Sequence, residues 1–251
     1  MILSKRYWIA ASVLGALCVS AVLGWAHLKA RSHALESMEA QCLAHQLNGV
    51  APCVRVDRGE GYVILRDRKG AQHFLLLPVE RISGIEGEQL LDPGTPNFFW
   101  YTWQNRGLLA GQNGRPIPDT NTMLAINSKL GRSQGQMHIH ISCTKADVVH
   151  HLSRLDGTIT DTWQPLQGGL EEHSYLARRV SIDQFEKIGP FRLLAFGFPR
   201  AFADMGRFSL AVTMSRRGDI LLLATERDML DLNLASAEEL QDQDCAGYNE
   251  P

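Results

Sequence analysis

The chain has 251 residues, of which 45% are hydrophobic and 21% are charged, and these values are typical of a folded globular protein. They exclude a collagen, a coiled coil, a long disordered chain and a polytopic transporter. Residues 1–31 hold four basic residues and no acidic one, so the rest carries 25 − 4 = 21 basic against 27 acidic residues, a net charge of −6. An acidic body without a Lys/Arg stripe argues against a nucleic-acid partner.

An uncharged run of 22 residues, 7–28, opens the chain. As a helix it would span about 33 Å, close to the roughly 30 Å hydrocarbon core of a bilayer. Lys5 and Arg6 precede the run, and Trp8 and Trp25 lie near its ends, where aromatic rings favour the membrane interface. The alternative is a cleaved signal peptide, which normally has a shorter apolar run and a small-x-small cleavage site. We therefore expect one N-terminal transmembrane helix.

The remaining sequence predicts an α+β fold, an antiparallel sheet with flanking helices. Polar turns at 68–71 and 215–219 each join two strand-like segments into a hairpin. Capping-box patterns begin at Ser181 and Ser236. In chain order, the pattern predicts a helix over 34–47, strands over 62–67 and 72–77, a helix over 97–109, strands over 122–128 and 137–143, a helix over 145–155, and strands over 174–180, 208–214 and 220–225.

Four of the five cysteines lie in the body of the chain, at Cys42, Cys53, Cys143 and Cys245. An even number in an exported body suggests two disulfides. Cys42 and Cys53 bracket a short loop, so we expect them to pair, which leaves Cys143 with Cys245. Four buried thiols are the alternative, and metal ligation is less favoured because no Cys-x-x-Cys spacing occurs. Disulfides would place the body in an oxidising compartment.

The most informative segment, residues 131–143, reads Gly-Arg-Ser-Gln-Gly-Gln-Met-His-Ile-His-Ile-Ser-Cys. Alternate side chains of a strand share a face, so Gln136, His138, His140 and Ser142 should project together while the apolar residues between them face the core. Two imidazoles about 7 Å apart behind a Gly-containing loop point to chemistry more than generic polar residues would.

Three interpretations of these histidines remain open from the residue types alone. In the first, a neutral imidazole attacks phosphorus and forms a phosphoramidate. In the second, His138 and His140 bind zinc with a third ligand such as His173 or Glu171. In the third, the histidines are polar surface residues without a catalytic role.

Several segments add a resemblance to known families. Residues 127–128 (Asn-Ser), 131–134 and 137–142 resemble the signature of the histidine-triad superfamily of nucleotide hydrolases and transferases. Together with the N-terminal run, further segments look like bacterial CDP-diacylglycerol pyrophosphatases. These segments are 61–65 (Gly-Tyr-Val-Ile-Leu), 92–100 (Asp-Pro-Gly-Thr-Pro-Asn-Phe-Phe-Trp), 125–128 (Ala-Ile-Asn-Ser), 175–179 (Tyr-Leu-Ala-Arg-Arg) and 235–239 (Ala-Ser-Ala-Glu-Glu).

This resemblance implies hydrolysis of CDP-diacylglycerol to CMP and phosphatidate, with no cofactor. The middle position of the triad is His138, which is the expected nucleophile and would form a cytidylyl-histidine. His140 occupies the third position and would orient or bind phosphate. Asn127 and Gln134 fall in the polar segment expected around the nucleotide and phosphates.

The first triad position holds Gln136, a departure from the superfamily signature. Glutamine can donate a hydrogen bond to a phosphate oxygen but cannot exchange a proton as imidazole does. We include Gln136, together with Ser142, among the expected substrate-binding residues.

The resemblance and the apolar run together predict residues 1–31 as a membrane anchor and residues 32–251 as a histidine-triad-like catalytic domain. That domain would face the periplasm from a single-pass protein of the bacterial inner membrane, and its partners would be CDP-diacylglycerol and the bilayer. Two other hypotheses stand beside it. One is a non-catalytic, membrane-anchored module that binds nucleotide or lipid, and the other is a zinc-dependent hydrolase that uses His138 and His140.

Overall fold

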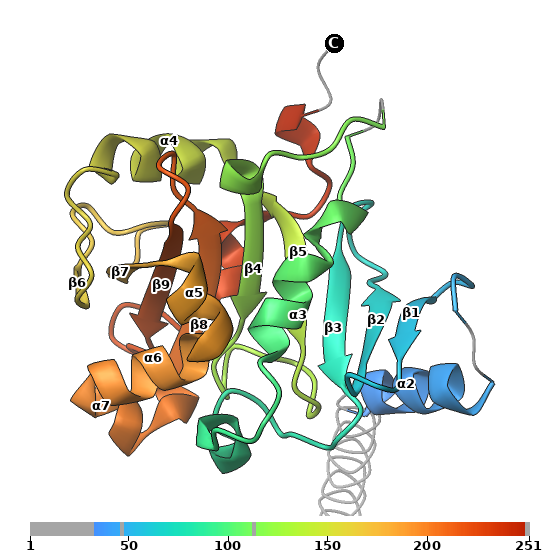
Figure 1. Cartoon of the computed structure of the whole chain (residues 1–251). Coiled ribbons are helices and arrows are strands. Elements are labelled where there is room, and N and C mark those ends of the chain that lie inside the picture. The colour runs from blue at the N-terminus through green and yellow to red at the C-terminus, as the bar shows by residue number, and fades with distance from the viewer. Residues whose placement is uncertain (1–32, 46–47, 112–113, 249–251) are drawn as a thin grey trace, which may run out of the picture.

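The structure is a computed structural model of the chain and describes residues 33–45, 48–111 and 114–248 (Figure 1). Within these residues ten strands form one sheet in the order β1-β2-β3-β5-β4-β8-β9-β7-β6, with β10 paired to β5. All of these pairings are antiparallel. The strands are β1 (Cys53–Asp57), β2 (Tyr62–Arg66), β3 (Phe74–Pro78), β4 (Thr122–Ile126), β5 (Ile139–Thr144), β6 (Gln164–Pro165), β7 (Leu176–Val180), β8 (Phe208–Met214), β9 (Ile220–Glu226) and β10 (Gln241–Asp242).

The helices are short, and most of them follow residues that suit a helix start. Ser181 and Gln184 form the predicted capping box, and proline occupies the first turn of the two helices after it. The α-helices are α2 (Ala34–Ala44), α3 (Phe98–Gln104), α4 (Ala146–Leu155), α5 (Ile182–Lys187), α6 (Pro190–Gly197) and α7 (Pro199–Ala203).

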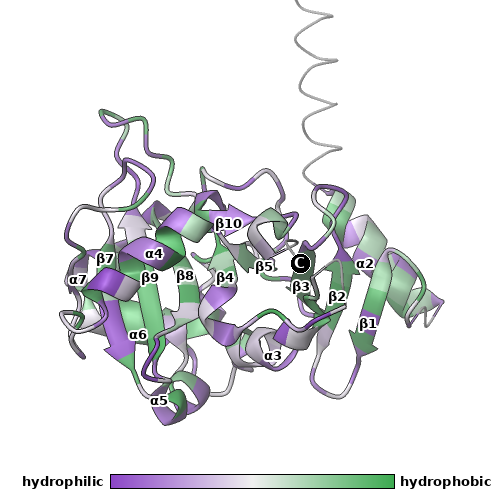
Figure 2. Ribbon diagram, turned by 90° about the horizontal axis from the view of Figure 1, so that it is seen from above, coloured by the Kyte–Doolittle hydropathy of each residue, from purple (hydrophilic) through white to green (hydrophobic). Residues whose placement is uncertain are grey.

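One face of the sheet carries the main hydrophobic core. Successive strand residues point to opposite faces, so Ile64, Leu76, Ile139 and Ile141 lie on the same side of neighbouring strands. Helices α3, α5 and α6 cover this side with buried aromatic and leucine side chains. The view in Figure 2 separates α3 and α5, on this side of the sheet, from α2 and β10 on the other.

The opposite face carries two smaller apolar clusters rather than one. Helix α2 packs Leu35 over Leu65 and Leu75 of β2 and β3. Helix α4 and the 3-10 turn Ala237–Leu240 cover β4, β8 and β9. Strand β5 lies between the two clusters, and its residues on this face are polar. The fold therefore leaves a polar strip in the middle of the sheet.

Two disulfides join distant parts of this arrangement. Cys42 on α2 is bonded to Cys53 at the start of β1, and Cys143 on β5 is bonded to Cys245 after β10. These are the two pairs expected from the sequence. The second bond fixes the C-terminal segment beside the strand that carries the histidines.

The structure corrects the expected fold class at its N-terminal end. None of the helices in the described residues is long and apolar enough to cross a membrane, and the longest, α2, has 11 residues. The run 7–28, on which the expectation of a transmembrane helix rested, lies outside the described residues. The fold class is thus corrected to an antiparallel sheet with short flanking helices. The expected single-pass inner-membrane localisation is corrected with it.

A second correction concerns the capping box expected at Ser236. The segment forms a 3-10 turn without a side-chain cap. The Ser236 hydroxyl instead donates to Oδ1 of Asn127 at 3.2 Å, because the segment packs against the end of β4. This contact brings Glu238 toward the histidine strand.

Candidate active site

His138 immediately precedes β5 and is buried, with 6% of its surface exposed. Its Nδ1 lies 2.8 Å from the carbonyl oxygen of Gln136. A carbonyl only accepts, so Nδ1 carries the proton of a neutral ring. Burial lowers the pKa of His138 below its ordinary value, against the smaller raising effects of this hydrogen bond and of Glu238. Nε2 is therefore left with a lone pair and can act as a nucleophile.

His140 is held by a second histidine, His73, which lies just before β3. The register pairs Leu75 with His140 and places His73 on the same face. His73 Nε2 lies 2.8 Å from His140 Nδ1, and His73 Nδ1 lies 3.0 Å from the carbonyl oxygen of Lys69. The two rings are stacked with their centroids 5.0 Å apart.

This chain of hydrogen bonds sets the tautomer of His140 when both rings are neutral. The Lys69 carbonyl accepts from Nδ1–H of His73, so His73 Nε2 accepts from Nδ1–H of His140. Burial, then the neighbouring His138 and His73, lower the pKa of His140 well below its ordinary value. Nε2 of His140 is a buried acceptor that has no hydrogen-bond partner among the described residues.

Glu238 faces that acceptor from the C-terminal segment. Its Oε2 lies 3.6 Å from Nε2 of His140 and accepts a 3.1 Å hydrogen bond from Nδ2 of Asn127. Asn127 in turn accepts from the backbone N–H of Glu238 at 3.2 Å. His140 Nε2 and Glu238 Oε2 are both acceptors, so a proton donor such as an attacking water fits beside them.

The histidines open into a cleft of about 420 Å³. One side of the cleft is apolar and comes from α2 and the neighbouring strands. The other side is polar, and the exposed Arg68 and Lys69 lie at its edge. The residues that line the cleft include Ala34, Leu35, Met38, Leu65, Arg68, Lys69, Leu75, Asn127, Gly131, Gln134, His138, His140 and Glu238. Apolar residues beside Arg66, Arg68 and Lys69, with Asp67 and Glu238 in the same lining, suit an amphipathic ligand that carries phosphate.

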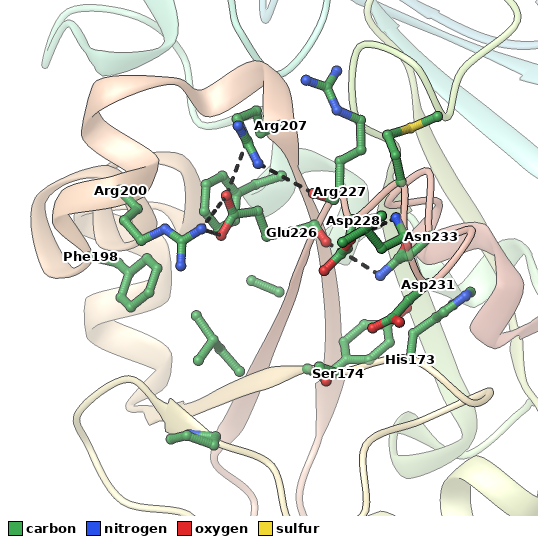
Figure 3. Close-up of a pocket in the computed structure, with 17 residues that line it drawn as sticks. His173, Ser174, Phe198, Arg200, Arg207, Glu226, Arg227, Asp228, Asp231 and Asn233 are labelled. Atoms are coloured by element: carbon green, nitrogen blue, oxygen red, sulfur yellow. Dashed lines mark hydrogen bonds and ion pairs between the residues drawn. The ribbon is translucent and has the colours of Figure 1, made fainter.

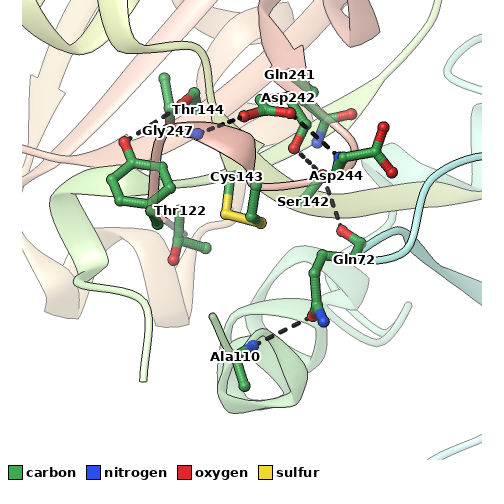
Figure 4. The surroundings of a disulfide bond; sticks show 12 residues. Gln72, Ala110, Thr122, Ser142, Cys143, Thr144, Gln241, Asp242, Asp244 and Gly247 are labelled. Atoms are coloured by element: carbon green, nitrogen blue, oxygen red, sulfur yellow. Dashed lines mark hydrogen bonds between the residues drawn. A yellow bond between two sulfur atoms is a disulfide. The ribbon is translucent and has the colours of Figure 1, made fainter. Parts of the chain in front are cut away.

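Two of the expected substrate-binding residues, Asn127 and Gln134, line this cleft. Gln136 does not, although its side chain lies toward α2, 3.5 Å from Glu39 on that helix. Its side-chain N–H donates instead to the carbonyl of Pro78 at 3.0 Å. Ser142 is also outside, since its hydroxyl lies 2.9 Å from the carbonyl oxygens of Gln72 and Asp242, under the segment that carries β10 (Figure 4).

The structure also places the residues named in the alternative zinc hypothesis. Among the described residues, the set with metal-like spacing is His73, His140 and Glu238, whose ligand atoms lie within 4.8 Å of one another. The rings of His73 and His140 already share a 2.8 Å hydrogen bond through Nε2 and Nδ1. His173 bonds to Glu239 and Glu171 pairs with Lys145, so neither joins His138 and His140.

Sequence reasoning missed His73, Glu238 and Lys69. One usable signal was His73 itself, a polar residue in the strand-like segment 72–77, on the face that antiparallel pairing brings beside His140. Glu238 gave no such signal, because 98 residues of chain separate it from His140 and only the tertiary fold joins them.

A larger cavity, of about 700 Å³, lies elsewhere, between β9, α7 and the loop after β9. Figure 3 shows Arg200 and Arg207 converging on Glu226 within it. His173 is the histidine of its lining and has no second imidazole beside it there, whereas His138 and His140 lie together in the cleft. The smaller cleft is the candidate active site.

Comparisons with known proteins show the family of the chain. The model of the CDP-diacylglycerol pyrophosphatase family matches residues 30–249. A solved structure of a DUF4931 family protein from Bacillus cereus is similar over 70% of this chain and 85% of its own, at 10% identity and a TM-score of 0.39. The placement in the wider histidine-triad superfamily stays a prediction. The match over most of its length shows that the chain belongs to the CDP-diacylglycerol pyrophosphatase family, which are hydrolases of CDP-diacylglycerol.

Proposed function

We propose that this hydrolase releases CMP and phosphatidate through a cytidylyl-histidine intermediate on His138, within a catalytic domain of residues 32–251. The observation that supports the proposal best is the hydrogen bond from His138 Nδ1–H to the carbonyl of Gln136. That bond keeps the proton on Nδ1 and leaves the lone pair on Nε2 of a histidine that lines the cleft.

In the first step, Nε2 of His138 forms a bond to the phosphorus of the CMP group, and the bond from that phosphorus to the bridging oxygen breaks. The electron pair leaves with phosphatidate, and the ring becomes a cation that the Gln136 carbonyl stabilises. Phosphatidate is a phosphate monoester whose second ionisation lies near pH 6, so it departs without a proton from a neighbouring acid. Position 136 then needs only its backbone carbonyl, which explains how a glutamine can occupy the first triad position.

In the second step, water attacks the same phosphorus and the bond to His138 breaks. Nε2 of His140 accepts the proton of this water, and the Glu238 carboxylate 3.6 Å away stabilises the imidazolium that forms. His73 keeps the proton of His140 on Nδ1 beforehand, so that Nε2 is the accepting atom. CMP leaves and His138 returns to its neutral form.

The walls of the cleft suggest how the substrate lies. Arg68 and Lys69 are exposed cations at its edge and would meet the pyrophosphate oxygens. Asn127 and Gln134 would contact the phosphates and nucleotide on the polar side. The glycerol end and the beginning of the acyl chains would follow the apolar wall made by α2, opposite the polar side.

The test is a rapid-quench experiment on the full-length protein with CDP-diacylglycerol labelled in the phosphate next to cytidine, in mixed micelles. The parent should incorporate label into protein before CMP reaches its steady rate. The variant His138→Ala should incorporate none and lose at least about a thousandfold in kcat. The matched control is His150→Ala, an exposed histidine on α4, which should behave as the parent. CMP release by His138→Ala at the parent's rate would exclude this nucleophile.

Adding a chelator to the assay, and measuring substrate binding beside it, decides between the alternatives. Activity that disappears with a chelator and returns with Zn²⁺ would favour the zinc-dependent hydrolase. Binding of CDP-diacylglycerol without turnover by a folded parent protein would favour the non-catalytic module.

A further inference from the structure

A group of exposed apolar side chains lies beside the cleft. Five of the eleven large hydrophobic residues that are exposed in the described part of the chain fall on two adjoining segments. Leu230 and Leu232 are the most exposed of them, at 94% and 83%. The five residues, which we call the apolar rim, are Leu130, Met229, Leu230, Leu232 and Leu234.

The rim is built on a held loop rather than on a loose end. Asp228 and Asn233 exchange backbone hydrogen bonds of 2.9 and 2.8 Å and close the loop between them. The Asn233 side chain anchors it to Thr225 on β9 at 2.8 Å. Leu232 adopts φ = +55°, a conformation that bulky residues rarely take. The loop thus keeps leucine side chains exposed to water and holds one of them in an unfavourable backbone conformation. Exposed apolar residues on such a fixed loop point to a partner.

The rim is continuous with the active cleft. The N–H and hydroxyl of Ser128 donate to the carbonyls of Ala235 and Leu234, at 2.9 and 2.6 Å. Ser128 directly follows Asn127, and the same segment reaches Glu238 three residues after Ala235. Leu130 borders Gly131, which lines the cleft. Met229 and Leu230 line the larger cavity, so the rim extends from that cavity to Leu130 at the edge of the cleft, and a partner on it would lie next to the site.

The charges around the rim nearly balance. Lys129, Arg200, Arg207 and Arg227 lie near it, and so do Glu226, Asp228 and Asp231. Glu226 is paired with Arg200 and Arg207. Figure 3 shows Arg227 directed away from this pairing. With charges so evenly matched, attraction to a strongly charged partner is weak, and the leucines provide the main contact.

We propose that the apolar rim inserts into the surface of the lipid bilayer that carries the substrate and so presents the cleft to it. The occupant follows from the family activity, because CDP-diacylglycerol has two acyl chains and is itself a component of a bilayer. Exposed leucines on a fixed loop next to the site suit the interfacial region of such a surface. The inference rests on the family's substrate but not on the identity of the nucleophile.

The experiment compares two substrates with the full-length protein. One is CDP-dihexanoylglycerol below its micelle concentration, and the other is CDP-dioleoylglycerol in phosphatidylcholine vesicles. The double variant Leu230→Ser/Leu232→Ser should lose at least about tenfold in kcat/KM on vesicles and stay within about twofold of the parent on the monomeric substrate. All proteins compared retain residues 7–28, so any lipid affinity of that segment is common to them.

The matched control is Phe202→Ser on α7, a similarly exposed apolar residue outside the rim, which should leave both rates unchanged. Equal losses on both substrates, no loss on vesicles, or the same loss in the control would overturn the proposal. A change in oligomeric state of the double variant, measured by sedimentation, would assign the rim to a second copy of the chain instead. Failure of the proposed function would appear differently, since the parent itself would then release no CMP from either substrate.

Discussion

The two histidines of β5 and its lead-in differ in the group that holds their second nitrogen. His138 donates to a backbone carbonyl, which cannot give a proton back. His140 donates to another imidazole, which can change its own protonation state. The first arrangement suits a nucleophile whose lone pair must always face the cleft, and the second suits a group that gains and loses a proton.

The lowered pKa of His138 makes a prediction for the pH dependence of the reaction. Only the ring with an unprotonated Nε2 attacks phosphorus, so activity is lost as pH falls through the pKa of His138. Burial moves that pKa below the ordinary 6.5. A profile of kcat/KM against pH, which reports the free enzyme, should stay flat above neutrality and fall on an acid limb centred below pH 6.5. An acid limb centred at or above pH 6.5 would contradict the assignment.

His73 makes a separate prediction, as a positioning residue. The variant His73→Phe keeps an aromatic ring beside His140 but removes the acceptor for its Nδ1–H. We expect label from the rapid-quench experiment to accumulate on the protein at nearly the parent's rate, while CMP release slows by about a hundredfold. His73→Gln, whose carbonyl can still accept, should recover part of that loss. A slower accumulation of label in His73→Phe would assign His73 to the first step instead.

At the scale of the element, α2 carries a carboxyl with an unusual environment. Glu39 is 6% exposed, and burial, together with the nearby Glu36, raises its pKa to about 7. Its nearest donor is the Gln136 side-chain N–H, 3.5 Å away. A carboxyl whose pKa is raised by folding holds its proton longer in the folded state, so stability falls as pH rises from about 4.5 to about 7.

This fall of stability with rising pH gives the prediction for Glu39→Gln, which keeps the shape of the side chain and stays neutral. The variant should match the parent near pH 4 and exceed its unfolding free energy by about 2–3 kcal/mol at pH 8. Urea unfolding at the two pH values measures the difference. Glu88→Gln, at an exposed glutamate, serves as the control and should change neither value. A destabilised variant at pH 8 would show that the carboxylate is favoured where it lies.

The strand elements were the part of the fold that the sequence predicted best. The alternation along 137–143 places His138 and His140 on one face, where both line the cleft. Gln136 and Ser142 do not line it. The Gln136 side chain is bonded to the Pro78 carbonyl, and Ser142 is covered by the segment that carries β10. Periodicity encodes neither of these contacts.

The short helices were harder to predict. Helices α6 and α7 have eight and five residues and follow each other across a proline, so neither fills the window of 11 or more residues in which helical periodicity is clear. The 3-10 turn after Ser236 matched a capping box in sequence but is shaped by its contact with Asn127. Tertiary contacts override local signals in segments this short.

At the scale of the whole molecule, the cleft is assembled from segments far apart in the chain. The site residues His73, Asn127, His140 and Glu238 lie just before β3, just after β4, on β5 and in the C-terminal segment, which the sheet order and β10 bring together. The sequence could identify the histidine strand on its own. It could not identify Glu238, because that contact depends on where the chain returns after β9.

The Cys143–Cys245 disulfide fixes this return, and its loss gives the last prediction. It closes a loop of 102 residues against 11 for Cys42–Cys53, so loop-closure entropy predicts losses of about 5 and about 3 kcal/mol for the two paired alanine variants. Only the loss of Cys143–Cys245 releases the segment that carries Glu238. We therefore expect Cys143→Ala/Cys245→Ala to lower kcat at temperatures where it is still folded, while Cys42→Ala/Cys53→Ala retains it. Denaturant unfolding and CMP release measure the two effects, and equal kcat in both variants would show that the sheet alone holds Glu238 in place.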